Sequence, residues 1–418
     1  MNIFLVKNFS IALAAITSLA QIAIFTRSLS IEDLAFLMFI FGVSNFAVFF
    51  DIASKPSYSI LKKRFLTGDN WNEHLFDLIK FFFFQFIFFT SVFFLVVFST
   101  SFLFAHSLNS AVIFLIVLSI GAIVMISALR VILASIDLYF YGEVIEMSRR
   151  LCFLLATIFI LYEKTLIVTS LIMFLSTLIL LIIMLRKIAR ICKKNFSSYF
   201  DYSFSKFKKT FQEIGMKGFN SLIVLGSDTL TYNLGYIIFG FSGNSQALII
   251  FGIWQRLYLA ISLLGQIIPD ILVHKITTEF FKNSIQKARK LFFLSFTLSF
   301  LSVFLISLLF FIFKDPIFKY WTNGDFLVGD FLLLALSIWL ISNVFQHSSG
   351  AFLAYHGKSF SLMRNISLSV SILIIIFASS FYIFSSNINY FLIVGGGIYF
   401  FGALIYFNNA LKILRNST

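Results

Sequence analysis

Of the ionisable residues inside, or close to the ends of, long apolar stretches of this 418-residue chain, four are the leading functional candidates: Arg27, Asp51, Asp228 and Arg256. A charge in the hydrocarbon core of a membrane costs at least ~2.5–3.5 kcal/mol on insertion scales, so each should face a cavity or a partner. Arg256 is the strongest candidate, because it lies near the middle of its stretch. A guanidinium at that depth would suit an anionic substrate group, above all a phosphate.

The other interpretation of Arg256 is an ion pair with Asp228 in the neighbouring stretch, and the two roles are compatible. Asp228 either holds Arg256 in place or carries a proton during a transport cycle. Asp51 precedes Lys55 and Pro56, which favours a role at a helix end.

Amide side chains inside the apolar stretches either line a cavity that accepts sugars or form hydrogen bonds between helices. They are Gln21, Asn45, Asn220, Asn233, Gln255, Gln266, Asn343 and Gln346. The predicted substrate-binding set combines two of them with the four charges: Arg256, Asp228, Arg27, Asp51, Gln255 and Asn233. No catalytic or metal-binding residue is predicted, because the five histidines lack metal-ligand spacing and no nucleophile–base set occurs.

These side chains must be positioned by membrane-spanning helices. Hydrophobic residues make up 60% of the chain and charged residues 12%, so the lipid bilayer must act as its solvent. Short alternating segments, as in a membrane β-barrel, do not occur. The predicted spans are 9–29, 34–54, 78–104, 111–134, 150–162, 166–185, 215–240, 247–273, 291–313, 331–355, 366–384 and 390–411. The fifth is short and is expected to begin earlier, near Tyr141.

The basic residues predict the orientation of these spans. With the N-terminus in the cytoplasm, 27 of the 32 Lys and Arg residues fall on the cytoplasmic side. Only Arg27, Lys164, Lys314 and Lys319 fall outside, and Arg256 lies within a span. Such an asymmetry over short loops predicts that both termini are cytoplasmic. The net charge of +14 therefore indicates topology and contact with anionic lipid, not nucleic-acid binding.

The longest polar stretch divides the chain into halves. We predict an N-terminal six-helix bundle over 1–185, a basic cytoplasmic linker over 186–214 and a C-terminal six-helix bundle over 215–418. Pro56 and Pro269 end the second and the eighth span, one in each half. Two six-span halves in the same orientation predict a parallel repeat, with a binding cavity between halves that rock against one another.

Several short motifs resemble those of bacterial polysaccharide flippases. The segment 26–35 (TRSLSIEDLA) is similar to the family's opening motif, and 50–53 (FDIA) to the end of its second span. The stretch 253–272, with QRL and IPD, is similar to the eighth span. The segments 316–324 and 354–358 resemble the outer loop before span ten and the turn after it. Ser30 and Ala53 replace glycines of the family pattern, which leaves the predicted fold unchanged.

The resemblance implies an all-α fold of twelve membrane helices, that of the multidrug/oligosaccharidyl-lipid/polysaccharide (MOP) exporter superfamily, and within it an O-antigen (Wzx-type) flippase. Such proteins move an undecaprenyl-diphosphate-linked oligosaccharide from the inner to the outer leaflet of the bacterial cytoplasmic membrane. The resemblance also implies Arg27 as a cavity residue, and a polysaccharide polymerase and a chain-length regulator as partners. No cofactor is expected; the coupling gradient, of protons or of sodium ions, stays open.

Two other function classes fit a many-spanned chain. A cation-coupled antiporter of small organic molecules would need buried carboxylates in the N-terminal half, where only Asp51 is available. A polysaccharide polymerase or membrane glycosyltransferase would need a large outer loop with catalytic residues. The longest outer loop here, 314–330, is too small for a domain, so we expect no enzyme.

Overall fold

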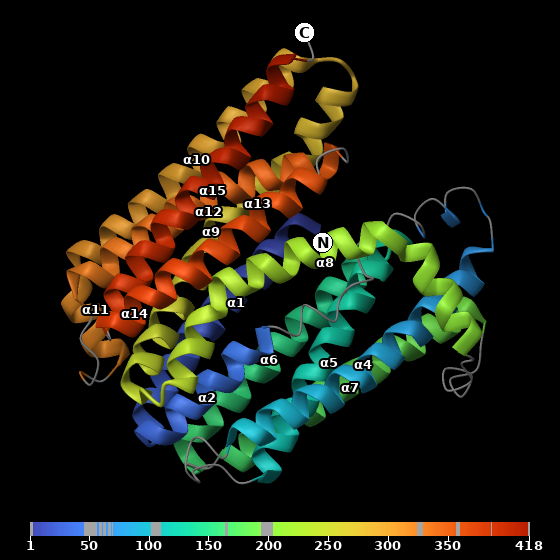
Figure 1. Ribbon diagram of the computed structural model, residues 1–418. Helices are drawn as coiled ribbons and strands as arrows, with labels where there is room; N and C mark the ends of the chain where they lie inside the picture. Colours follow the sequence, from blue (N-terminus) through green and yellow to red (C-terminus); the bar gives the residue numbers. More distant parts are fainter. Residues whose placement is uncertain are drawn as a thin grey trace. The chain divides into compact units, whose positions relative to one another are not determined.

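The computed structural model describes residues 3–416 except 46–56, 58–60, 62–63, 66–67, 69, 102–109, 164–165, 194–203, 323, 325–328, 357–359 and 386. The chain divides into two compact units, unit 1 (Met1–Gly226) and unit 2 (Ser227–Thr418). The described secondary structure is helical throughout (Figure 1). Asp51, Lys55 and Pro56 lie outside the described residues, so their predicted roles stay predictions.

The described residues of unit 1 form six long or medium helices before α8 (Phe204–Phe241), and the last of the six extends into the segment expected to be a linker, as does the beginning of α8. These are α1 (Ile3–Ser28), α2 (Ile31–Ser44), α4 (Trp71–Ser101), α5 (Ser110–Ser135), α6 (Tyr139–Glu163) and α7 (Leu166–Cys192). Helix α8 begins in unit 1 and continues into unit 2. Contacts join α1 with α6, and α5 with α4, α6 and α7.

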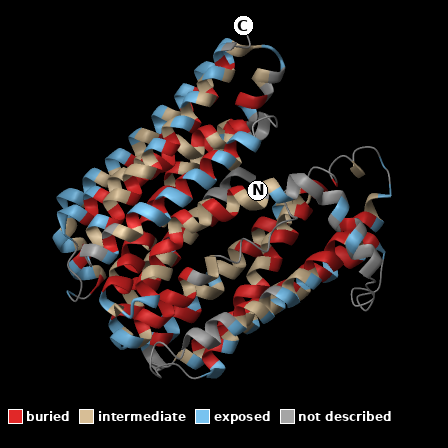
Figure 2. Ribbon diagram, viewed as in Figure 1, coloured by how far each residue is buried: buried red, intermediate tan, exposed pale blue. Residues whose placement is uncertain are grey.

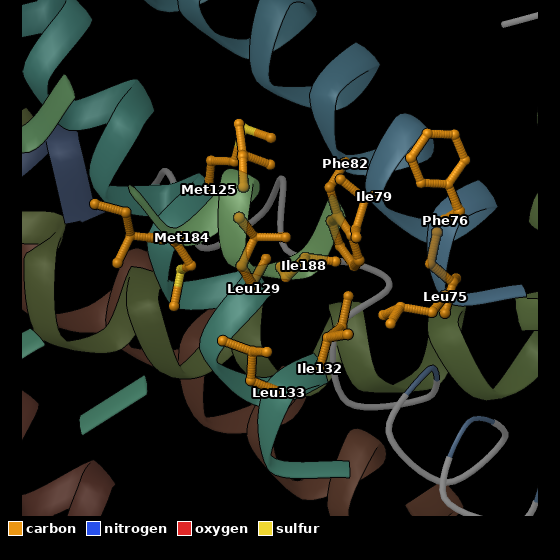
Figure 3. Packing of buried hydrophobic residues seen from close by; sticks show 14 of the residues in the cluster. Leu75, Phe76, Ile79, Phe82, Met125, Leu129, Ile132, Leu133, Met184 and Ile188 are labelled. Carbon is orange, nitrogen blue, oxygen red and sulfur yellow. The ribbon is translucent and has the colours of Figure 1, made fainter. Parts of the chain in front are cut away.

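The apolar core of unit 1 lies where α4, α5 and α7 meet (Figure 3). Buried residues recur at intervals of three or four, as Leu75, Ile79 and Phe82 do on α4. Met125, Leu129 and Ile132 follow the same period on α5, and Met184 and Ile188 on α7. This spacing places the large side chains of each helix on one face, which explains why the three helices pack together.

Unit 2 completes α8 and adds a second set of helices. They are α9 (Ser245–Phe281), α10 (Ile285–Ile312), the short α11 (Lys314–Trp321), α12 (Asp330–His356), α13 (Phe360–Leu373), the π-helix η4 (Ile374–Ala378), α14 (Ser379–Ser385) and α15 (Ile388–Asn416). Helix α12 contacts α9, α10 and α15, so it is central to the unit. On α11, a hydrogen bond to Asp330 raises the pKa of the exposed Lys314 ammonium.

The core of unit 2 is aromatic and depends on glycines. Trp339 on α12 is fully buried and donates a hydrogen bond from its indole nitrogen to the Leu392 carbonyl (2.8 Å). A Cβ atom at Gly396 would lie 2.8 Å from this indole, and one at Gly395 would lie 3.2 Å away. The glycine run therefore lets α15 approach α12 closely.

Ten described helices are long and apolar enough to cross a membrane. The other two predicted spans correspond to α2, described only to Ser44, and to α6, whose first half carries Glu143, Glu146, Arg149 and Arg150. Helix α6 begins at Tyr139, which confirms that the fifth span starts earlier than its apolar part. Many large apolar residues are exposed, for example along α10 (Figure 2), as expected for helices that face lipid.

Candidate functional site

Arg256 lies in the apolar span of α9, and its side chain is half-buried. The hydroxyl of Tyr236 on α8 lies beside its guanidinium. Tyr236 in turn donates to Gln255 Oε1 (3.1 Å), and Gln255 Nε2 donates to Asn233 Oδ1 (3.0 Å). Tyr236, Gln255 and Asn233 are all buried, so this chain of neutral groups connects α8 to α9 and orients the arginine.

The structure thus brings three of the predicted site residues together, Arg256, Gln255 and Asn233. A hydrogen bond between helices was one of the two roles predicted for the amides Gln255 and Asn233, and the structure contains this bond. Asn233 also donates from Nδ2 to the Thr229 carbonyl (2.8 Å), so its donor and its acceptor are both engaged. We call Arg256, Tyr236, Gln255 and Asn233 the arginine site.

Asp228 lies on the same helix, α8, and on the same face as Tyr232 and Tyr236, because residues four apart are neighbours along a helix. Its half-buried carboxylate accepts a hydrogen bond from Gln346 Nε2 on α12 (3.2 Å). The described partners of Asp228 and Arg256 are therefore on different helices, α12 and α8, and both partners are neutral.

Gln346 extends this contact into a tyrosine network. Its Oε1 accepts from the Tyr232 hydroxyl (3.0 Å), and the Tyr232 and Tyr399 hydroxyls lie 2.5 Å apart. The ring of Tyr232 also stacks on Tyr258, with ring centroids 5.6 Å apart. Asp228 therefore belongs to a network that spans α8, α9, α12 and α15; we call Asp228, Gln346, Tyr232 and Tyr399 the aspartate site.

A small polar cavity of about 10 Å³ adjoins the Asp228 carboxylate. This volume is about the minimum that one water molecule needs. Its polar lining includes Thr231, Ser367 and Tyr406 besides members of the aspartate site. Ser371, three residues before the π-helix, bonds to Thr231 (2.9 Å) and to the Ser227 carbonyl (2.7 Å), which holds α13 against α8 at this point.

Two further sets of polar contacts join α9 to α12: the first realises the interhelical hydrogen bonding predicted for Gln266 and Asn343, and the second was not predicted from the sequence. Asn343 joins Gln266 (3.1 Å) to the Tyr258 hydroxyl (3.1 Å), and His347 Nε2 lies 2.9 Å from Asp270 Oδ1. The sequence signal for the second pair was an ionisable residue in each of two apolar spans. His347 was considered only as a metal ligand, and Asp270 only as part of a motif, so neither was paired.

The remaining predicted site residues lie elsewhere. Arg27 is in the last turn of α1 in unit 1, and its side chain is exposed. Asp51 is outside the described residues, and the structure therefore adds nothing to its prediction.

Unit 1 contains a separate charged cluster around Glu146 on α6. Arg149 binds the Glu146 carboxylate through two nitrogens (2.6 and 2.9 Å), and Arg150 Nε binds it at 2.9 Å. Arg130 on α5 approaches Glu143 (3.7 Å) and Glu146 (3.9 Å). Arg150 also donates to the backbone carbonyl of residue 10 on α1. The cluster therefore links α1, α5 and α6, and we call it the unit 1 charge cluster.

The sequence matches no family model and no curated protein. Its fold matches an inward-facing multidrug resistance MATE family transporter of the MOP superfamily, with a TM-score of 0.75 and 11% identity over 96% of this chain and 95% of that one. The lipid II flippase MurJ, inward closed, gives 0.65 and 15% over 98% and 90%. A MOP superfamily transporter from Pyrococcus furiosus, described as having a binding pocket of reverse polarity, gives 0.65 and 11% over 99% and 95%.

These similarities show the fold. The chain is a multi-pass membrane protein with the helical architecture of MATE and MOP superfamily transporters, as the sequence predicted. The structures that it resembles are transporters and a flippase, not enzymes.

Proposed function

We propose that this protein is a flippase for undecaprenyl-diphosphate-linked oligosaccharides of the O-antigen or capsule type. In this proposal it acts in the bacterial cytoplasmic membrane and moves its substrate from the inner to the outer leaflet by alternating access. The observation that carries the proposal is Arg256, a half-buried cation within a membrane span.

The chemistry of the arginine site fits a diphosphate. A guanidinium presents several N–H donors in a planar fork, which matches two oxygens of a phosphate group. The Tyr236 hydroxyl lies beside Arg256 and is itself held by Gln255, so it can orient the fork before substrate arrives. A preorganised donor loses less conformational entropy on binding than a freely rotating one.

The aspartate site fits a role in coupling. A carboxylate at membrane depth beside a polar cavity of about one water is suited to bind a proton or a sodium ion. We propose that Asp228 carries the coupling cation, and that Arg256 contacts the substrate. A polysaccharide polymerase and a chain-length regulator would then receive the flipped product.

The fold likeness to a multidrug resistance MATE transporter favours one second candidate, an antiporter of small organic molecules. The positive charge of Arg256 distinguishes the flippase from the antiporter. An organic cation would be repelled by Arg256, whereas an anionic lipid carrier would be attracted to it.

Complementation tests the proposal directly. The gene is expressed in a strain that lacks its own O-antigen flippase, and surface polysaccharide is measured. We expect the natural protein to restore it, and Arg256→Ala to abolish it while the amount of membrane protein holds. Arg256→Lys should restore only part, because a point charge replaces the bidentate fork.

The matched control is Arg186→Ala, which removes an exposed arginine near the end of α7. It should keep full activity. Surface glycan unchanged in Arg256→Ala would remove this residue from the mechanism. Efflux of organic cations by the natural protein, without restored polysaccharide, would support the antiporter instead.

A further inference from the structure

Asp270 on α9 and His347 on α12 form a titratable pair that the proposed function leaves unused. Their facing atoms, Oδ1 and Nε2, lie 2.9 Å apart, and each side chain is about one third exposed, 32% and 29%. Both residues lie within helices apolar enough to cross the membrane. Ionisable groups at such depth are costly and mark functional positions.

The pair lies directly after a weak point in α9. Pro269 has no backbone N–H, so the carbonyl of Gly265, four residues earlier, lacks its helical donor. Gly265 also packs closely on α10, where an added Cβ would lie 2.6 Å from Val303. Helix interiors bend most readily at proline. The segment Asp270–Phe281 is therefore the part of α9 that can move against the rest, and His347 joins its first residue to α12.

The helices in contact with α9 and α12 carry further ionisable residues, and these helices include α8, α10, α13 and α15. Near the ends that the charge pattern places in the cytoplasm, the described ionisable residues of α9, α10, α13 and α15 are Lys275, Glu279, Lys282, Lys287, Arg289, Lys290, Arg364, Lys412 and Arg415. The other described ionisable residues of these helices include Tyr258, Tyr399, Tyr406 and Asp228, and Asp330 begins α12.

Most of the ionisable residues at the predicted cytoplasmic ends are cations, which oppose a further positive charge nearby. Those of α10 and α15 are exposed, so salt screens their charges. Asp270 Oδ1 lies in direct contact with the His347 imidazole. Histidine side chains in general can gain or lose a proton between about pH 5 and 8, and an imidazole that faces a carboxylate forms an ion pair when it is protonated and a neutral hydrogen bond when it is not.

We propose that Asp270 and His347 form a proton-binding latch. When His347 binds a proton, the ion pair with Asp270 holds the Asp270–Phe281 segment of α9 against α12. When the proton leaves, the contact weakens and the segment is released at Pro269. The latch would serve the transport cycle proposed above and in that sense rests on it, but its proton dependence is a property of unit 2 that needs no substrate to be measured.

Hydrogen–deuterium exchange of the purified full-length protein in lipid nanodiscs tests this proposal. Exchange of peptides covering residues 271–281 is compared at about pH 6 and about pH 8, after correction for the intrinsic pH dependence of exchange. Peptides from the last turns of α15 provide the internal reference. We expect protection of 271–281 to fall about two- to fivefold at the higher pH, the range of a partly exposed ion pair.

Three variants identify the groups responsible. His347→Lys, a permanent cation, should keep protection at both pH values. His347→Gln and Asp270→Asn should each lack the pH dependence. The matched control His74→Gln, which changes a histidine of α4 in unit 1, should retain the natural pH dependence.

A pH-independent natural protein, or pH dependence that persists in either His347→Gln or Asp270→Asn, would overturn the latch. One of these variants changes His347 and the other changes Asp270, so the test stays informative if one of them fails to fold. A protein that shows the latch but moves no lipid-linked oligosaccharide would refute the proposed function alone.

Discussion

The two units of this protein differ in the described contacts of their embedded charges. In unit 1, Glu146 is contacted by three arginines, and acids and bases neutralise one another within one cluster. In unit 2, the neutral side chains Tyr236 and Gln346 contact Arg256 and Asp228. Charges that satisfy each other hold helices together, whereas a neutral dipole orients a charge without neutralising it.

The charged groups of the two units also differ in their positions relative to the apolar spans. The unit 1 charge cluster occupies the first half of α6, before the apolar part of the fifth span, where arginine head groups reach the interface. The arginine and aspartate sites lie well inside apolar spans. We therefore expect substitutions in unit 2 to affect transport, and substitutions in the unit 1 charge cluster to affect stability.

The largest effect should come from Asp228→Asn. The amide has nearly the same shape and can keep a hydrogen bond with Gln346, so the helices should pack as before. It cannot take up a cation, so we expect the rate of oligosaccharide transport into proteoliposomes under an imposed proton or sodium gradient to fall at least about tenfold, ~1.4 kcal/mol. Full gradient-driven transport in this variant would exclude a coupling role for Asp228.

Glu146→Gln tests the opposite prediction in unit 1. It leaves the arginines of the cluster without their shared carboxylate, and breaking a buried pair from one side costs about 3–5 kcal/mol. Because the arginines are partly exposed, 13–28%, we expect about 2 kcal/mol. Thermal unfolding in detergent measures the loss. Glu73→Gln, at an exposed acid of α4, is the control and should be neutral. Equal stability of the two variants would contradict a structural role for the cluster.

Gly396→Ala separates packing from chemistry within unit 2. The new methyl would meet the Trp339 indole at 2.8 Å, and overpacking of this kind costs about 1–3 kcal/mol. Gly397→Ala offers a neighbouring control, because a Cβ there meets nothing within 4 Å. Unfolding temperature should drop only for the first variant, and a drop in both would point to helix flexibility instead of contact with Trp339.

The smallest effect should come from Tyr236→Phe. It removes the hydroxyl that orients Arg256 but keeps the charge and the ring, so about 1 kcal/mol of substrate binding should be lost. Binding of an undecaprenyl diphosphate to the purified protein, measured by titration, should weaken about fivefold. A loss as large as that of Arg256→Ala would mean that Tyr236 itself contacts the substrate.

Much of the fold could be predicted from the sequence, because hydropathy reflects a property of each segment alone. The presence of ten of the twelve spans and the early start of α6 follow from local composition. The close approach at Gly395 and Gly396 follows from the small size of glycine, which permits close helix packing in any arrangement.

The site was predictable only in part. Arg256 and Asp228 could be identified because a charge within an apolar run is costly wherever it lies. Their partners could not, because Tyr236, Gln346 and Tyr232 are ordinary residues of membrane helices until neighbouring helices place their polar atoms within hydrogen-bond reach. The Asp270–His347 contact joins residues 77 positions apart, and nothing in either local sequence specifies the other.

By itself, the sequence determined that this chain enters a membrane many times and which few charges its helices must accommodate, and it predicted the orientation of the chain in the membrane. These properties arise from transfer free energies that act residue by residue. Only the tertiary structure decided that Arg256 meets a tyrosine, that Asp228 meets an amide beside a cavity, and that the histidine of α12 meets the aspartate after Pro269. Those contacts depend on the rotation and register of packed helices, which many sequences of the same hydropathy would set differently.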